Sequence, residues 1–210
     1  MASFSLNRIV RRQLSSIVQI LKCWKCEHQF QLTPSKIFCS KCHAVQPLSP
    51  NVDYFSYLEL EKSYRIEEEA LKKKFRSIQS HVHPDKHAGT ERKQQEFSEQ
   101  HSSYLNQAYK TLKDPRSRAA YLLELMTNKA LEETKDNEMA AKIFEFMTEI
   151  DEMNDPKELK QKAEDIDREV EKLLSQVDAA FQQSDMKTAR SILNRLRYFD
   201  RAKKIIDKKL

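Results

Sequence analysis

The chain has 210 residues, of which 37 are Lys or Arg, 32 are Asp or Glu and only one, Gly89, is glycine. An average glycine content of about 7% would give roughly fifteen. Folds that bind phosphate on glycine-rich turns, such as P-loop and Rossmann enzymes, are therefore disfavoured, and so is a turn-rich β-sandwich. The 33% of charged residues, together with long alternations of Glu, Lys, Leu and Ala, is typical of an all-α protein. No stretch approaches the roughly 18 apolar residues that a membrane span needs.

The net charge of +5 belongs to the N-terminal segment. Residues 1–26 contain five basic residues and no acidic one, whereas the rest of the chain carries 32 basic and 32 acidic residues. A nucleic-acid-binding protein is expected to have a basic domain. The charge distribution therefore argues against nucleic acid as a partner.

Residues 1–22 read as a mitochondrial targeting segment. They are rich in Ser and Arg, contain no acid and are amphipathic, which is typical of a presequence and predicts the mitochondrial matrix. Arg8, Arg11 and Arg12 interrupt the apolar core that a secretory signal requires. The alternative is a basic amphipathic helix that lies on a membrane or a partner.

The four cysteines form two Cys-x-x-Cys pairs, Cys23 with Cys26 and Cys39 with Cys42. Two residues between thiolates let both sulfur atoms point at one ion, and two such pairs complete a tetrahedral site. We therefore predict a four-cysteine module over residues 23–46 that binds one structural ion, with zinc favoured over iron. Disulfides suit a secreted chain and a redox pair normally opens a helix after a strand, so both alternatives are less favoured. Whether the module binds a partner or braces the next domain stays open.

Helical periodicity begins after Pro50. A short helix is expected over residues 54–60, and a longer one from Glu67 to His83 on apolar residues spaced by three and four. The longer helix must end near His83, because the proline that follows disfavours helical geometry at that residue. A polar stretch, 85–91, separates it from a second helix that stops at Asp114. The two long helices should form an antiparallel pair.

These residues resemble a J-domain, the module with which co-chaperones stimulate ATP hydrolysis by DnaK-type chaperones. The resemblance rests on the run His83-Pro84-Asp85-Lys86 between two helices of matching period, supported by residues 53–55 and 106–112. It implies that His83, Pro84, Asp85 and Lys86 contact the chaperone. A proline-held loop projects the aspartate carboxylate, which can then meet an arginine in a charge-assisted hydrogen bond.

Basic residues of the first long helix are candidate contacts for the same partner. Lys72, Lys73 and Arg76 can steer the domain to an acidic surface, which mainly raises the association rate. The alternative is an ordinary solvated helix face, on which charges contribute little.

The sequence after this domain resembles one particular group of J-domain proteins. Residues 118–125 (Arg-Ala-Ala-Tyr-Leu-Leu-Glu-Leu) continue directly from Asp114-Pro115, as in HscB-type J-proteins, the co-chaperones dedicated to iron–sulfur cluster assembly. The similarity runs from Asp53 almost to the C-terminus, and the four-cysteine module is like that of the metal-binding subset. It implies a J-domain with its connecting helix over 53–126. Met126-Thr127 departs from the family's usual His-Gly, and His87 from its usual aromatic residue.

Residues 127–210 predict a three-helix bundle independently of the resemblance. Three apolar stripes of helical spacing are separated by short breaks at 154–156 and 184–185, so the helices should be antiparallel neighbours. A single long coiled coil is disfavoured by these breaks. The predicted fold class is therefore all-α: a J-domain helical hairpin and a C-terminal three-helix bundle, preceded by the small four-cysteine module.

Two aromatic residues of the bundle, Phe144 and Tyr198, fall outside the stripes, which suggests a protein-binding surface. For Phe144, packing against the helix over 121–125 is the alternative. The resemblance implies that this surface contacts the IscU-type scaffold that carries the nascent cluster. It adds Glu149 and Glu152 as acidic positions, and Met147 as an apolar residue available on a rotated helix.

The predicted function is that of an L-shaped adaptor rather than an enzyme. The bundle holds the scaffold while the J-domain recruits a DnaK-type chaperone, stimulates its ATPase and promotes cluster transfer. Two rival hypotheses are a general mitochondrial J-protein with a different client and, less favoured, a zinc-dependent nucleic-acid-binding protein. The zero net charge beyond residue 26 argues against the latter.

Overall fold

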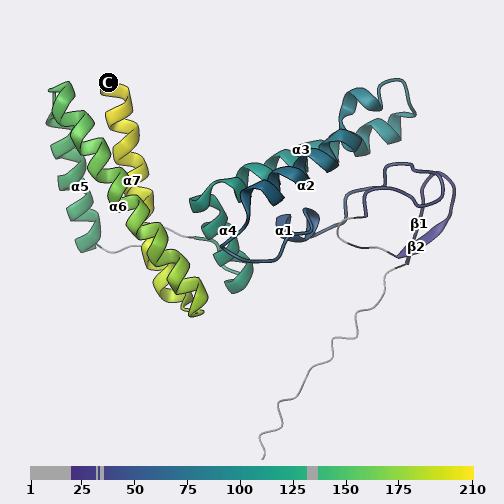
Figure 1. Cartoon of the computed structure of the whole chain (residues 1–210), viewed down its shortest axis with the longest axis horizontal. Helices are drawn as coiled ribbons and strands as arrows, with labels where there is room; N and C mark the ends of the chain where they lie inside the picture. Colours follow the sequence, from purple (N-terminus) through teal and green to yellow (C-terminus); the bar gives the residue numbers. More distant parts are fainter. Residues whose placement is uncertain (1–19, 32, 34–35, 132–136) are drawn as a thin grey trace, which may run out of the picture.

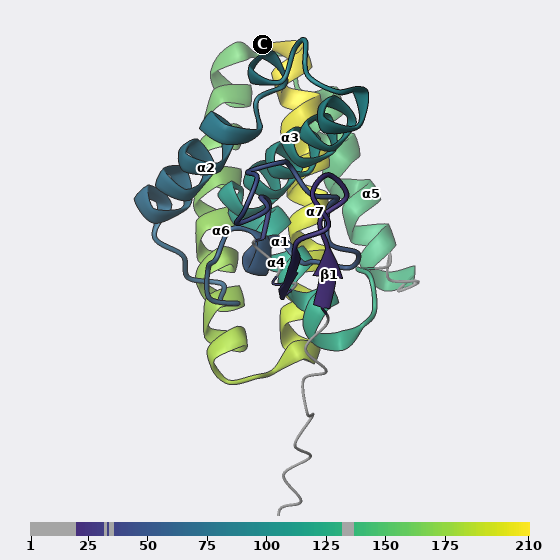
Figure 2. The same ribbon diagram turned by 90° about the vertical axis from the view of Figure 1, so that its right-hand side faces the viewer.

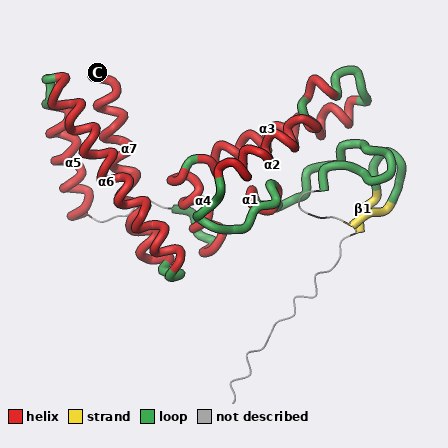
Figure 3. Tube along the Cα trace, in the orientation of Figure 1, coloured by secondary structure: helices red, strands yellow, loops and turns green. Residues whose placement is uncertain are grey.

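The computed structural model describes residues 20–31, 33, 36–131 and 137–210. Within these residues the regular structure is helical apart from one small sheet, and the helices form two arms that meet at an angle (Figures 1 and 3). The predicted all-α fold class is therefore confirmed. No helix of the described part is both long and apolar enough to cross a membrane. Residues 1–19, most of the predicted targeting segment, lie outside the described residues.

A two-stranded antiparallel sheet stands at the N-terminal end. Strand β1 (Ile20–Lys22) pairs with β2 (Gln29–Gln31), and Leu21 faces Phe30 across the pair. The last three residues assigned to the targeting segment are thus strand residues. The surrounding module has a small core of its own, formed by four buried residues: Cys23, Phe30, Cys39 and Ala44.

The first arm is the hairpin of α2 (Glu68–Val82) and α3 (Arg92–Lys113), with the short α1 (Tyr54–Tyr57) beside it. The expected helix over 54–60 is shorter than predicted because the chain turns at Glu59, where φ is +53°. The apolar residues predicted to face inward do so, and Leu71, Val82 and Leu105 are fully buried or nearly so.

The second arm is the bundle of α5 (Asn137–Glu152), α6 (Pro156–Gln182) and α7 (Met186–Lys209), joined to the hairpin through α4 (Pro115–Thr127). Asp114, Asp155 and Asp185 cap α4, α6 and α7 by accepting a hydrogen bond from a first-turn N–H. Helix α4 ends at Asn128 in the left-handed conformation, at φ 53°. Asparagine thus fills the role that glycine commonly has at a helix C-terminus.

Aromatic and ionic contacts join the two arms. The ring of Tyr64, in the segment before α2, stacks on Phe181 of α6 with 5.6 Å between centroids. The guanidinium of Arg118 in α4 lies 5.1 Å from the Tyr64 centroid, and Arg65 forms an ion pair with Asp178 at 2.5 Å. The angle between the arms is therefore fixed by packing as well as by the chain connection.

Candidate functional site

The His83-Pro84-Asp85 loop lies at the end of the hairpin farthest from the bundle (Figure 1). Residues 84–86 form one 3₁₀ turn, η1, closed by a hydrogen bond of 3.0 Å from the Lys86 N–H to the His83 carbonyl. The Asp85 N–H donates to Nδ1 of His83 at 3.3 Å. The Asp85 side chain is 90% exposed. The loop thus presents its carboxylate to solvent, in a geometry held by its own backbone.

The predicted basic residues lie in the N-terminal and middle turns of α2, whereas the loop follows the C-terminal end of that helix. Lys73 and Arg76 are exposed, whereas Lys72 is half-buried and pairs with Glu69 at 3.4 Å. The shallow hollow that these three basic residues line also includes Glu67 and Glu69. The face therefore carries both signs of charge at its N-terminal end and is purely basic only near Lys73 and Arg76.

Hydrogen bonds from behind the loop reach the last carbonyls of α2. Nε2 of His87 donates to the His81 carbonyl at 2.9 Å, and the Ser98 hydroxyl donates to the Val82 carbonyl at 2.8 Å. These carbonyls have no partner within the helix, so the side chains satisfy them. From the sequence, His87 was noted only as a departure from the family, and its role in holding the loop was missed.

The four cysteines converge on one point, as predicted. Their Sγ atoms all lie within 4.8 Å of one another, with 3.6 Å between Cys23 and Cys42 and 3.7 Å between Cys26 and Cys39. A tetrahedral ion with metal–sulfur bonds of about 2.3 Å would separate its sulfur ligands by about 3.8 Å. Backbone N–H groups two residues after Cys23 and Cys39 donate to their Sγ atoms at 3.4 Å. The donor set and its spacing therefore fit a metal ion.

The thiols have unequal acidities. Burial raises the pKa of Cys23, but hydrogen bonds from the backbone N–H groups of Cys26 and Lys25 outweigh it and lower the pKa to about 6. The Ala44 N–H lowers the pKa of Cys42, but burial and hydrogen bonds with the other thiols raise it to about 12. A metal ion binds the deprotonated thiolates, so binding of a cation here would release the protons of these thiols.

The four-cysteine module packs on α3 near the loop. The Trp24 ring meets Phe97 edge to face, 6.0 Å between centroids, with the Lys93 ammonium 5.3 Å from the Trp24 ring centre. Deeper in the contact, Nε2 of His101 donates to the Gln46 carbonyl at 3.0 Å. Figure 2 views the chain from the side of this module. The module therefore contacts the helical hairpin directly.

The predicted scaffold-binding residues of α5 are mostly exposed. Phe144 is 75% exposed, so the alternative that it packs on α4 is wrong. Glu149 and Glu152 are exposed and Met147 is half-buried; Glu149 forms an ion pair of 2.8 Å with Lys162. A phenylalanine that is three-quarters exposed in the middle of a well-formed helix remains available to a partner.

Tyr198, on α7, is half-buried rather than fully exposed. Its neighbour Phe199 meets Phe146 of α5 edge to face, with 6.1 Å between centroids. Met147 directly follows Phe146 in α5, and Tyr198 directly precedes Phe199 in α7. The two predicted positions are thus carried by helices that pack against each other.

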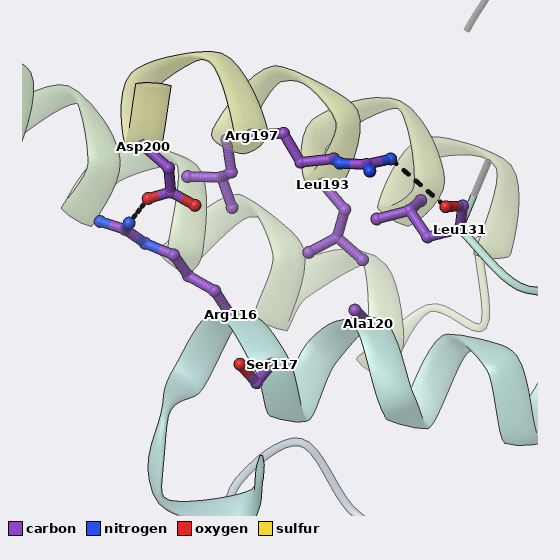
Figure 4. A pocket seen from close by; sticks show the side chains of 8 residues that line it. Arg116, Ser117, Ala120, Leu131, Leu193, Arg197 and Asp200 are labelled. Atoms are coloured by element: carbon purple, nitrogen blue, oxygen red, sulfur yellow. Dashed lines mark hydrogen bonds and ion pairs between the residues drawn. The ribbon is translucent and has the colours of Figure 1, made fainter. Parts of the chain in front are cut away.

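A cavity of about 300 Å³ lies at the joint between α4 and α7 (Figure 4). The Arg116–Asp200 ion pair lies at one end, and Nη1 of Arg197 donates to the Leu131 carbonyl at the other, at 3.3 Å. Leu193 contributes to the apolar lining between them. These contacts tie α4 and the segment after it to α7.

Comparison with known proteins identifies first the class and then the family. The family model described as the DnaJ domain matches residues 53–121, and that described as the HSCB C-terminal oligomerisation domain matches residues 135–207. The chain is accordingly a J-domain protein. Both matches fall on the two helical arms described above.

Relatives that match most of the chain define the family. The human iron–sulfur cluster co-chaperone protein HscB is 34% identical over 187 residues, which covers 85% of this chain and 77% of the human one; the mouse protein of the same name is 30% identical over 182 residues, which covers 85% and 78%. The crystal structure of human HscB matches with a TM-score of 0.81 at 31% identity and covers 90% of this chain and 98% of that one. The chain therefore belongs to the HscB family of iron–sulfur cluster co-chaperones. This agrees with the prediction that it is a co-chaperone and not an enzyme.

Proposed function

We propose that this chain delivers an IscU-type scaffold protein to a DnaK-type mitochondrial chaperone and stimulates the chaperone's ATPase, which promotes transfer of the cluster. The observation that carries the proposal is the presence of two separate exposed surfaces on one chain with braced arms. The Asp85 carboxylate is at the end of one arm, and the Phe144 ring is on the other.

At the chaperone side, the Asp85 side chain is 90% exposed, and its ion-pair contact among the described residues is with Nδ1 of the His83 ring, 3.6 Å away. An arginine of the chaperone can therefore form a charge-assisted hydrogen bond with it. Lys73 and Arg76 then act on the encounter through long-range attraction to an acidic surface. His83, Pro84 and Lys86 complete the contact by fixing the turn.

At the scaffold side, Phe144 is the anchor of the proposed contact, because a large exposed aromatic ring gains most from burial against a partner. Met147 and Tyr198 flank it as half-buried positions, and Glu152 supplies an acidic rim. Glu149 is partly neutralised by Lys162, so we expect it to contribute less than Glu152.

Holding both partners on one chain raises the effective concentration of the scaffold at the chaperone. Contacts between the two arms support this role, because the Tyr64–Phe181 stack and the Arg65–Asp178 ion pair keep the arms at one angle. ATP hydrolysis itself belongs to the chaperone. The J-domain shifts the chaperone between its nucleotide states.

We further propose that the metal is a single structural zinc ion held by Cys23, Cys26, Cys39 and Cys42. Bound zinc would neutralise thiolate charge and cross-link the module. We also propose that the protein acts in the mitochondrial matrix and that residues 1–19 are the part of the targeting segment that is removed on import. Cleavage before Ile20 would leave β1 intact, and therefore its pairing with β2.

The test is the steady-state ATPase rate of a purified DnaK-type mitochondrial chaperone with the full chain, with an IscU-type scaffold, and with both. Synergy between the two additions is expected. Stimulation by the chain that the scaffold does not increase would favour the rival general J-protein with another client. No stimulation in either condition would refute the proposal.

A further inference from the structure

One side-chain amide connects the four-cysteine module to the loop region of the J-domain. Oε1 of Gln94, in the first turn of α3, accepts a hydrogen bond of 3.1 Å from the backbone N–H of Val45. Nε2 of the same amide lies 3.3 Å from Nδ1 of His87. Both ends of the Gln94 amide are thus used, one toward the module and one toward the loop.

The ring of His87 continues the connection. Its Nε2 is 2.9 Å from the His81 carbonyl, which can only accept, so Nε2 carries the proton and Nδ1 accepts from Gln94. In the series of hydrogen bonds from Val45 through Gln94 and His87 to the His81 carbonyl, every donor therefore meets an acceptor. A flipped Gln94 amide would set its NH₂ group against the Val45 N–H, which fixes the orientation of the amide. The series ends in the last turn of α2, two residues before His83.

The other end of the series is built into the cysteine site. The Val45 carbonyl accepts from Nε1 of Trp24, which lies between the first two cysteines, at 2.7 Å. The next residue, Gln46, donates from Nε2 to Sγ of Cys23 at 3.4 Å. Val45 itself is fully buried and belongs to the main hydrophobic core. The segment of residues 44–46, which presents the Val45 N–H, is thus held by the residues that surround the metal site.

The hairpin holds one side of this segment, because Val45 packs in the main core and the Gln46 carbonyl accepts a hydrogen bond from His101. The side that faces the cysteines relies on the module itself. Its own core consists of four buried residues, two of which are the ligands Cys23 and Cys39. A core of this size cannot offset the conformational entropy of the segment, and such modules depend on their metal for order. Removal of the ion should therefore loosen the cysteine side of the segment and weaken the hydrogen bond from Val45 to Gln94.

We propose that the four-cysteine module positions the His83-Pro84-Asp85 loop through Gln94 and His87, so that the order of the loop depends on the metal. Gln94 and His87 are positioning residues in this scheme, because neither belongs to the loop tripeptide itself. The module then acts as a metal-dependent control on the chaperone-facing surface, in addition to its structural role.

The neighbouring glutamine provides a matched control. Gln95 is also half-buried, and its Nε2 donates to the Thr90 carbonyl at 2.8 Å, so it contacts the same loop region. It has no hydrogen bond to the module among the described residues. Gln94→Met and Gln95→Met each remove one amide at equal length, but only the first breaks the connection.

The experiment is amide hydrogen exchange of residues 85–90 in the full chain, reconstituted with Zn²⁺ or stripped of it by a chelator. In the wild type and in Gln95→Met, stripping should accelerate exchange by about fivefold, the factor of one lost hydrogen bond. In Gln94→Met, exchange should already be fast with Zn²⁺ bound, and stripping should add little. An equal effect of stripping in wild type and Gln94→Met would overturn the proposal, and so would no effect in the wild type.

Zinc affinity gives a second, independent readout. Coupling between two sites is reciprocal, so Gln94→Met should bind Zn²⁺ more weakly than Gln95→Met by about the same factor, fivefold, in competition with a chromogenic chelator. Equal affinities of the two variants would contradict the coupling. Neither readout uses a chaperone or a scaffold, so a failure here would leave the proposed function untouched.

Discussion

Replacement of Tyr64 by leucine would test how strongly the two arms are held. Tyr64 is 8% exposed; its ring stacks on Phe181 and lies under the guanidinium of Arg118, which is also 8% exposed. Leucine retains much of the buried apolar surface but removes both ring contacts. The stacked pair is worth about 1 kcal/mol beyond burial, and the cation–π contact about 1 kcal/mol more. We therefore expect Tyr64→Leu to lower the free energy of unfolding by about 2 kcal/mol.

Urea unfolding followed by circular dichroism measures this loss, and small-angle X-ray scattering reports whether the angle between the arms becomes variable. Tyr109→Leu is the matched control, because Tyr109 stacks on Phe75 with 4.3 Å between centroids and has an ammonium, that of Lys113, 5.9 Å from its ring centre. Those contacts all lie within one arm. Tyr109→Leu should leave the scattering profile unchanged. If Tyr64→Leu also left it unchanged, the contacts of Tyr64 would not set the angle between the arms.

Three further predictions concern the loop, the scaffold face and the module. His83→Gln should abolish stimulation of the chaperone ATPase with an unchanged circular dichroism spectrum; retained stimulation would exclude the loop as the contact. Phe144→Ala should weaken scaffold capture by about tenfold or more, as expected for an interface anchor, whereas Thr148→Ala, one turn along the same helix, should not; equal capture by both would remove Phe144 from the interface. Burial lowers the pKa of His101 from its usual 6.5, so the folded state favours the neutral ring. The stability that this preference contributes is fully present above about pH 6.5 and falls as the pH drops below it. Urea midpoints at pH 7 and pH 5 should therefore differ less for His101→Gln than for the wild type, and an equal difference would show that His101 does not contribute.

The helices and the loop could be read from the sequence because their signals are local. Apolar residues at steps of three and four define each inward face, and an aspartate caps α4, α6 and α7 from the position directly before the first turn. Proline at 84 ends α2 whatever surrounds it. The spacing of the cysteines likewise predicts their convergence, since two residues between thiolates suffice to aim both at one ion.

Contacts between distant segments could not be read in this way. Nothing near Gln94 signals that it meets Val45, and nothing near Tyr64 signals Phe181, because a glutamine or a tyrosine has the same helical spacing wherever its partner lies. The half-burial of Tyr198 follows from the packing of α7 on α5, not from its polar neighbours along the chain.

The sequence by itself thus determined the helices, the convergence of the four cysteines, the exposed loop and the family, all of which depend on residues a few positions apart. The tertiary structure alone decided where the four-cysteine module docks and what holds the two arms at their angle. The physical reason is that docking depends on which side chains face each other after the chain has folded back, and that information is spread over residues far apart in sequence.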